Sequence, residues 1–549
     1  MKATLLSIIS ALALLSMSLS SRAQSPIIIK DINPGSLDGA VGQTYLRVGD
    51  KIYFWGSDGV TGNELWVTDG TAAGTTLVSE IIPGPNGAIV MDMLGTYQGK
   101  LVFMADDSIH GREPWISDGT SAGTFMLADI NPGAGNSIPA YARECLGKLY
   151  FQADDGTHGQ EPWVSDGTVA GTHLLEDVQP GFGSSGPRYF TEYNGAVYFQ
   201  TYTTSYGYEP WVTIGSGATL YQDLQPGFSD GGFYTPCVYN GKLYFGGYST
   251  ASGLELWVTD GQPANTALFA DINPGTGSGF AEGAIDTMGG RLFFNGSDGT
   301  HGFELWATDG TVGGTAMVHD IEPSGSGSFP THFIRLGHKL ICIAGEGIDI
   351  RNLWATDLTT LATEKVSRFD PTYNNVVRYP TIWRDSIYYF DYGTYDGSQY
   401  LYDLYVTAGD SASVRRINRL TLQNSINTNS WLDATTHGIV YRARYDVGTG
   451  YELYTLDIPS GPNSIAATSD KDELHLCPNP AYGTLYLTSD RPFVEASVSI
   501  SDQLGREVVT YSALTGDRLQ IDVSAIPAGV YTLHIADGAH ESVRRFCKE

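Results

Sequence analysis

The chain has 549 residues, with 31 Lys and Arg against 60 Asp and Glu, so its formal net charge is −29. A surface this acidic repels phosphate backbones, which argues against nucleic acid as a partner and leaves cations, basic proteins and neutral glycans open. Charged residues make up only 17% of the chain, whereas 67 Gly and 33 Tyr enrich it in turn and strand formers. This composition is typical of an all-β extracellular protein.

The first 23 residues have the pattern of a secretory signal peptide. One basic residue, Lys2, precedes an apolar run from Ala3 to Leu19, and the small residues Ser21 and Ala23 occupy the positions that precede a cleavage site. The run is too short for a comfortable membrane span, so an uncleaved anchor is the weaker alternative. No later segment resembles a span, and we expect no transmembrane segment once the leader is removed.

Residues 24–460 are predicted to form a tandem β-repeat. The pattern E-[LP]-W-x-x-D-G-T-x-x-G-T, followed by D-[IV]-x-P-G, recurs at intervals of 46 to 51 residues. Each copy contains four short β-rich runs separated by Gly-containing turns, which indicates a blade of an all-β propeller. The aromatic anchors of the copies are Trp66, Trp115, Trp163, Trp211, Trp257, Trp306, Trp354, Tyr405 and Tyr454.

The number of copies predicts nine blades. The segment Ile27–Ile32 has the pattern of a fourth strand with no preceding three, and the ninth copy, which ends in "YELYTLDI", lacks its fourth. We therefore expect the two ends of the repeat to complete one blade, which would leave no open edge. Because the last copies are degenerate and propellers usually have about four to eight blades, eight blades or an open superhelical array remain as alternatives.

The repeat resembles the ELWxxDGT-repeat family of bacterial secreted proteins. The resemblance is clearest in "NELWVTDGTAAGT" and "FELWATDGTVGGT". It implies export and a repeat architecture, and it transfers no catalytic residues.

The acidic residues of the repeat are predicted to be structural. A catalytic pair is needed once, at one place, whereas these carboxylates recur in copy after copy. Asp-Gly after a strand favours a turn, because Asp accepts hydrogen bonds from the local backbone and Gly tolerates positive φ. The recurring positions are Glu64, Glu113, Glu161, Glu209, Glu255, Glu304 and Glu452; Asp69, Asp118, Asp166, Asp260 and Asp309; and Asp31, Asp129, Asp177, Asp223, Asp271 and Asp320.

Three copies place a histidine three residues after an aspartate, in the loop between the second and third strands. Calcium would bind the carboxylate oxygens and a transition metal the imidazole, but the other copies lack this spacing. We therefore favour a polar hairpin without a cofactor, keep calcium as the alternative, and assign no metal ligands. The pairs are Asp107 and His110, Asp155 and His158, and Asp298 and His301.

Five cysteines are too few for the disulfide framework of a small secreted protein. Cys145, Cys237 and Cys342 lie in strand regions of different copies, and we expect them to be buried and unpaired. Cys477 and Cys547 flank the C-terminal segment, where a disulfide between them or two free thiols are both open.

A linker, residues 461–472, separates the repeat from a C-terminal domain, residues 473–549. Its short alternating strands and Gly turns are typical of a small immunoglobulin-like β-sandwich. Its motifs Pro478-Asn479-Pro480, Gly505-Arg506 and Gly529-Val530-Tyr531 resemble those of the type A C-terminal sorting domain of the type IX secretion system of Bacteroidota.

The resemblance to sorting domains implies recognition by the type IX secretion machinery, followed by release or by attachment to the outer cell surface. Two departures from the family are Cys477, where Tyr is common, and Cys547, which interrupts the basic and hydrophobic ending. An ordinary immunoglobulin-like binding module is the alternative.

We favour a secreted or cell-surface β-propeller that binds an extracellular glycan or protein, with no catalytic or cofactor-binding residues assigned. The sequence contains no G-x-S-x-G, H-E-x-x-H or phosphate-binding loop motif. The alternative is a secreted propeller glycosidase or lyase with its active site in the central channel, to be sought where the repeat breaks, at Ile214, Arg351-Asn352 and Asp403. A purely structural surface protein is the third hypothesis.

Overall fold

A computed structural model describes residues 26–347, 350–367, 376–395, 400–421, 431–443, 450–456, 475–477, 484–501, 506–527, 529–537 and 540–548. The chain divides into two compact units, residues 1–462 and 463–549, and each is described by itself. The predicted signal peptide, the linker 461–472, Pro478-Asn479-Pro480 and Gly505 lie outside the described residues.

In the described part of the first unit, the strands form nine groups of four, each an antiparallel meander. Groups one to three are β2 (Ala40–Val48), β3 (Lys51–Ser57), β4 (Asn63–Thr68) and β5 (Thr76–Ser79); β6 (Ile89–Tyr97), β7 (Lys100–Asp106), β8 (Arg112–Ser117) and β9 (Phe125–Met126); and β10 (Ala140–Cys145), β11 (Lys148–Asp154), β12 (Gln160–Ser165) and β13 (His173–Leu174).

Groups four to six follow the same order of strands, with two short 3-10 turns, η1 (Pro263–Asn265) and η2 (Val312–Gly314), before the last strands of groups five and six. Their strands are β14 (Arg188–Tyr193), β15 (Ala196–Thr203), β16 (Gly207–Thr213) and β17 (Thr219–Leu220); β18 (Tyr234–Tyr239), β19 (Lys242–Ser249), β20 (Gly253–Thr259) and β21 (Ala267–Ala270); and β22 (Phe280–Met288), β23 (Arg291–Gly296), β24 (Glu304–Thr308) and β25 (Ala316–His319).

Groups seven and eight are joined into one sheet by a single parallel bridge, and group nine takes its fourth strand from the start of the chain. Their strands are β26 (Thr331–Leu336), β27 (Lys339–Gly345), β28 (Arg351–Asp357) and β29 (Thr363–Lys365); β30 (Val376–Trp383), β31 (Ser386–Tyr395), β32 (Tyr400–Thr407) and β33 (Arg415–Thr421); and β34 (Leu432–Thr435), β35 (Gly438–Ala443), β36 (Glu452–Leu456) and β1 (Pro26–Lys30).

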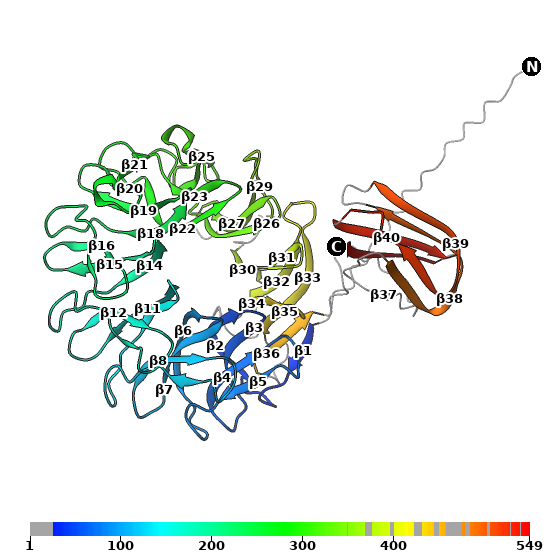
Figure 1. Cartoon of the computed structure of the whole chain (residues 1–549), viewed down its shortest axis with the longest axis horizontal. Helices are drawn as coiled ribbons and strands as arrows, with labels where there is room; N and C mark the ends of the chain where they lie inside the picture. The colour runs from blue at the N-terminus through cyan, green and yellow to red at the C-terminus, as the bar shows by residue number, and fades with distance from the viewer. Residues whose placement is uncertain are drawn as a thin grey trace, which may run out of the picture. The chain divides into compact units, whose positions relative to one another are not determined.

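The strand at the start of the chain completes the last group, as predicted. Strand β1 pairs antiparallel with β36, with Ile28 opposite Tyr454. Ile29 and Ile32 are buried in one hydrophobic cluster with Trp66 of group one and Trp431 beside β34. Burying these side chains draws both ends of the repeat together. The groups therefore follow one another around a ring, and the last contacts the first (Figure 1).

A buried arginine also holds the two ends of the repeat together. Arg442 on β35 donates from Nε to the carbonyl oxygen of Ala40 at 2.7 Å, and its guanidinium lies 4.0 Å from the ring centroid of Tyr451. The amide of Tyr451 donates to Asp38 Oδ1 at 3.0 Å. Burial lowers the pKa of Arg442 to about 10, so the side chain remains a cation at neutral pH. These contacts join the ninth group to the segment that leads into the first.

The residue before the anchor tryptophan controls the length of the fourth strand. Where it is leucine, the fourth strand has three or four residues, as in group one, where Leu65 of β4 pairs with Ser79. Where it is proline, as Pro162 in β12, the fourth strand has only two residues. Proline lacks the N–H that would continue the ladder, so pairing stops there.

Cys145 and Cys342 are buried and unpaired, as expected, but Cys237 is unpaired and only half-buried. The reason is that the two first-strand positions are not equivalent: Cys145 ends β10 opposite Lys148, whereas Cys237 lies two residues before the end of β18, opposite Tyr244. The prediction of burial was therefore wrong for Cys237.

The second unit is all-β and antiparallel, as predicted, and its sandwich arrangement stays a prediction. Its strands are β37 (His475–Cys477), β38 (Thr484–Ser501), β39 (Glu507–Asp522), β40 (Gly529–Asp537) and β41 (His540–Lys548), and within the described residues they form one hydrogen-bonded sheet.

Strand β38 links these strands by hydrogen bonds. It pairs with β39 through several register shifts and also pairs with β40 over its last residues. Such irregularities let one strand bend around a core. That core includes Leu487, Val498 and Leu533. The side chains of Cys477 and Cys547 lie outside the described set, so their disulfide stays a prediction.

Candidate functional site

Seven glutamates of the repeat are fully buried and bind the backbone that connects one group to the next. Glu161 accepts hydrogen bonds from the amide of Val178 at 3.0 Å, the amide of Ser185 at 3.1 Å and the hydroxyl of Ser185 at 2.6 Å. Because Ser185 lies just before β14, the carboxylate fixes the connection between groups three and four. The seven are Glu64, Glu113, Glu161, Glu209, Glu255, Glu304 and Glu452.

The same contact closes the ring. Glu452 accepts a hydrogen bond from the amide of Ile32 at 3.0 Å, although the two residues are 420 positions apart. Burial raises the pKa of Glu161 and Glu452 to about 7 and that of Glu209 to about 8, against the hydrogen bonds, which lower it. These carboxyls are held inside the protein by backbone donors, which agrees with the structural role predicted for them.

The recurring aspartates close the turn between the third and fourth strands. Asp166 accepts hydrogen bonds from the amide of Thr168 at 3.0 Å and from its hydroxyl at 2.6 Å, and that hydroxyl in turn accepts from the amide of Gly171. Asp69, Asp118 and Asp309 make the same bonds to the threonine two positions on. This confirms the predicted role of these aspartates in turns.

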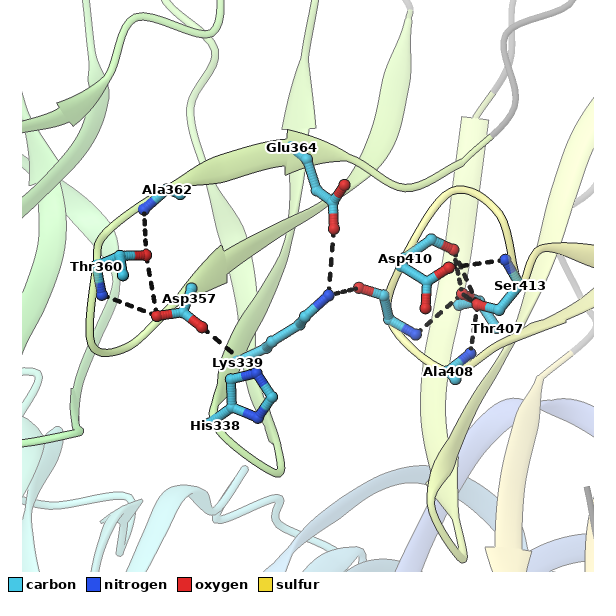
Figure 2. Close-up of polar contacts among 11 residues, drawn as sticks. His338, Lys339, Asp357, Thr360, Ala362, Glu364, Thr407, Ala408, Asp410 and Ser413 are labelled. Carbon is cyan, nitrogen blue, oxygen red and sulfur yellow. Dashed lines mark hydrogen bonds and ion pairs between the residues drawn. The ribbon is translucent and has the colours of Figure 1, made fainter. Parts of the chain in front are cut away.

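The degenerate copies keep these turns by other means. In group seven, Asp357 accepts from the amide of Thr360 at 2.8 Å, and in group eight Asp410 accepts from the amide of Ser413 at 2.8 Å. Figure 2 shows Lys339 extended between the two turns, where it donates to Glu364 at 3.2 Å and to the carbonyl oxygen of residue 409 at 2.7 Å. This polar cluster joins two neighbouring groups and is structural.

The Asp-x-x-His loops are hairpins in which the histidine bonds to its own aspartate. The Nδ1 to Oδ2 distances are 2.7 Å for His110 and His158 and 2.8 Å for His301. In group one Thr61 takes the place of the histidine and donates to Asp58 at 2.9 Å. Across the described ranges, no group of three or more His, Cys, Asp or Glu side chains could hold a metal ion.

The predicted breaks of the repeat do not mark one site. Asn352 and Asp403 are buried at the position of the repeated glutamate in groups seven and eight. Asn352 accepts from the Ser367 hydroxyl at 2.9 Å, and Asp403 pairs with Arg416 at 3.2 Å. Ile214 is 81% exposed in the turn after β16. Asn352 and Asp403 therefore each make their contact within their own group.

A different set of residues gathers at the ends of strands in groups four and five. We call it the aromatic cluster, and it consists of Arg188, Tyr189, Tyr202, Tyr208 and Tyr234. The guanidinium of Arg188 lies 5.8 Å from the ring centroid of Tyr189 and 5.1 Å from that of Tyr208. The rings of Tyr202 and Tyr208 are 5.2 Å apart, and those of Tyr189 and Tyr234 are 6.4 Å apart and edge-on. All five side chains are partly exposed.

The meander explains why these residues meet. Arg188, Tyr189 and Tyr234 begin β14 and β18, the first strands of their groups, which are neighbours on the inner side of the ring (Figure 1). Tyr202 and Tyr208 pair across the hairpin of β15 and β16. In an antiparallel meander, this hairpin and the connections between groups lie at the same end of the strands. Five side chains from two groups therefore converge at one end.

The backbone at this end is strained. Tyr189 has φ of 62°, and the equivalent residues of other first strands, Tyr141 and His332, have φ of 55° and 57°. Each lies where the pairing register shifts. A left-handed conformation is costly for a side chain with a Cβ, and its recurrence in several groups makes it a feature of the irregularity in the first strand.

The connections that lead into β14 and β18 carry further polar and apolar side chains. Asp230 accepts from the amide of Tyr208 at 2.8 Å, which fixes the connection between groups four and five to the hairpin. Phe182 and Phe228, at equivalent places in the connections before β14 and β18, are 83% and 84% exposed. The Nε of Arg188 is buried and has no hydrogen-bond partner among the described residues. The site thus offers aromatic faces together with the N–H donors of a partly exposed guanidinium.

Sequence reasoning missed the aromatic cluster. It sought function in breaks of the repeated motif, whereas group four keeps that motif intact. The available signal was the change from Gln160 in the third copy to Tyr208 in the fourth, together with the pair Arg188-Tyr189.

Residues 475–549 match a family described as a secretion system C-terminal sorting domain. The domain marks proteins exported by type IX secretion. This protein is therefore exported, and it is either secreted or attached to the cell surface. No helix among the described residues is long and apolar enough to cross a membrane. Among curated proteins, none matches the sequence.

Several solved structures resemble part of the chain at 10–13% identity. A prolyl endopeptidase has a TM-score of 0.38 at 10% identity and covers 68% of this chain and 55% of its own. A puromycin hydrolase (0.36, 13%) covers 70% and 60%, and oligopeptidase B from Leishmania major (0.38, 12%) covers 68% and 54%. The chain thus spans less than two thirds of each of these proteins, and nothing of their activities is carried over.

Proposed function

We propose that this protein is an exported, nine-bladed β-propeller of the ELWxxDGT-repeat type that binds an extracellular ligand. Its nine groups of four strands would be the blades, with β1 and β36 paired in the blade that closes the ring. A cleaved leader at residues 1–23 and the sorting domain would carry it through the two membranes.

One observation supports binding rather than turnover. The aromatic cluster brings five partly exposed side chains from two blades together around an arginine whose Nε has no partner. By contrast, the repeated glutamates are buried and occupied by backbone donors. Rings and donors at a surface are the chemistry of a binding site, whereas a hydrolase needs an acid and a base that are free to act.

The export part of the proposal is tested by deleting residues 470–549 in the source bacterium. We expect the truncated protein to remain inside the cell, because it lacks the sorting domain. Fractionation and immunoblotting of medium, envelope and cell lysate measure this. Normal appearance outside the cell would contradict the export route.

The binding part is tested with the purified mature chain. It should bind at least one class of extracellular glycan or protein, and simultaneous replacement of Tyr189 and Tyr208 by Ala should remove that binding without unfolding the protein. Biolayer interferometry and a thermal melt measure the two effects. Release of a cleaved product from the bound ligand would instead favour an enzyme.

A further inference from the structure

We infer that the aromatic cluster binds a neutral oligosaccharide, with sugar rings stacked on the tyrosines and sugar hydroxyls bonded to Arg188 and its neighbours. This inference rests on the proposed binding function and names the ligand class of that site. It is argued from shape, hydrogen-bonding capacity and charge.

The aromatic faces suit the C–H face of a sugar ring. A pyranose has one side lined by C–H groups, and these pack against the electron-rich face of an aromatic ring. Tyr208 and Tyr202 lie side by side at 5.2 Å, and Tyr189 and Tyr234 form a second pair at 6.4 Å. Because Arg188 lies over both Tyr189 and Tyr208, the two pairs form one continuous surface.

The polar groups of the cluster suit hydroxyls. A sugar hydroxyl both donates and accepts, so its site needs both kinds of partner. Arg188 is partly exposed, and its guanidinium carries N–H donors besides the buried Nε, and the tyrosine hydroxyls can donate or accept. The carboxylate of Asp230, which already accepts from the amide of Tyr208, has further acceptor capacity. A purely apolar ligand would leave the arginine donor unsatisfied.

Charge favours a neutral ligand. The net charge of −29 repels anionic chains at long range. A cationic ligand would meet Arg188 at the centre of the cluster. A neutral ligand avoids both penalties.

The connections that lead into β14 and β18 favour an oligosaccharide over a single sugar. Phe182 and Phe228 stand in the connections that precede β14 and β18 and are more than four fifths exposed. In the first of these connections, the side-chain oxygen Oε1 of Gln179 accepts a hydrogen bond from the amide of Thr204 at 2.8 Å. This bond ties the connection to the hairpin of β15 and β16. Exposed rings of this kind on fixed connections would extend the stacking surface beyond one sugar.

The test begins with the mature chain on an array of neutral, uronate-containing and sulfated oligosaccharides. The neutral oligosaccharide with the strongest signal is then titrated by calorimetry against the wild type, Tyr208→Ala, Tyr208→Phe, Tyr189→Gly and the control Ile214→Ala. Ile214 is a more exposed apolar side chain on the turn after β16, at the opposite end of that strand from the hairpin of β15 and β16.

We expect Tyr208→Ala and Tyr189→Gly each to weaken binding at least tenfold, and Tyr208→Phe, which keeps the ring, to stay within about threefold of wild type. Ile214→Ala should bind as wild type does. Thermal melts identify any variant that fails to fold, and Tyr208→Phe and Tyr189→Gly keep the test decisive if Tyr208→Ala does fail.

Two outcomes overturn the inference. Neutral oligosaccharides bound equally well by wild type, Tyr208→Ala and Tyr189→Gly would place the glycan elsewhere, and binding confined to sulfated or uronate-containing chains would contradict the ligand class. If the array is silent but an extracellular protein binds and is lost with Tyr208→Ala, the glycan inference fails while the proposed binding function stands. If nothing binds, both fail.

Discussion

Groups three and four are neighbours in the ring and share one frame, yet they differ at one end of their strands. Both have a buried glutamate, a proline before the tryptophan and a two-residue fourth strand. Group three carries Ala140, Asp154, His158 and Gln160 where group four carries Arg188, Tyr202, Tyr206 and Tyr208.

The comparison shows that the residues that build each group and the residues at the ends of its strands vary independently. We call the first set, the buried glutamate, the anchor tryptophan and the Asp-Gly-Thr turn, the frame. The glutamate is buried inside the group, and the Asp-Gly-Thr turn bonds to its own backbone, so both are required by the fold of the four strands. Residues at the ends of the inner three strands are not required for the four strands to fold. At these positions group four has three tyrosines and an arginine, where group three has an alanine and a polar hairpin.

The largest expected effect tests the shared frame. Trp163→Ala in group three and Trp211→Ala in group four should each lower the free energy of unfolding by about 3–5 kcal/mol, because both rings pack in clusters between groups. Urea unfolding followed by fluorescence measures it. A loss below about 1 kcal/mol for Trp163 would refute its anchoring role.

The buried glutamates come next. Glu161→Ala and Glu209→Ala should each cost about 1–3 kcal/mol, because the amides of Val178 and of Leu224 would lose their buried acceptor. Similar losses from the two variants would sharpen the claim of a common frame. A loss for only one of them would show that the frame is not shared.

The pH dependence follows from the same carboxyls. Their pKa in the folded protein, about 7 for Glu161 and about 8 for Glu209, lies above the ordinary value of 4.5. The folded state therefore holds extra protons, and the stability that these groups contribute is fully present below pH 4.5 and lost as the pH rises through 7 to 8. The urea midpoint should fall between pH 5.5 and 8.5, and less steeply in Glu161→Gln. A midpoint that rises over this range would contradict this.

The smallest expected effect on stability comes from glycine substitutions at the positive-φ positions, which test whether Tyr189 acts in binding. Tyr189→Gly in group four and Tyr141→Gly in group three should change the free energy of unfolding by no more than about 1 kcal/mol, since glycine relieves the positive φ of both positions. Only Tyr189→Gly should impair binding. A thermal melt and a binding assay on both variants measure these effects. An equal loss of binding in the two variants would contradict the distinction between the two groups.

Much of the frame could be predicted from the spacing of the tryptophans, because a repeat of constant length forces each copy into the same meander. The pairing of β1 with β36 also followed from the missing strands at the two ends. In the second unit, alternation predicts antiparallel strands but not the long, bent strand β38, because its bends depend on register shifts.

The aromatic cluster could not be predicted for a similar reason. Tyr202 and Tyr208 become neighbours only through the register of β15 and β16, and Tyr189 and Tyr234 only through the contact of two groups. The left-handed backbone at Tyr189 leaves no mark in the sequence, since tyrosine is not a residue that favours it.

The most direct test of the account exchanges the distinguishing residues while leaving the frame untouched. A double variant, Arg188→Ala with Tyr208→Gln, gives group four the residues that group three carries at these positions. Its melting temperature and its binding to the neutral oligosaccharide are measured on the same sample. The account predicts a melting temperature within about 3 °C of wild type and loss of binding. Retained binding by this folded variant would contradict it.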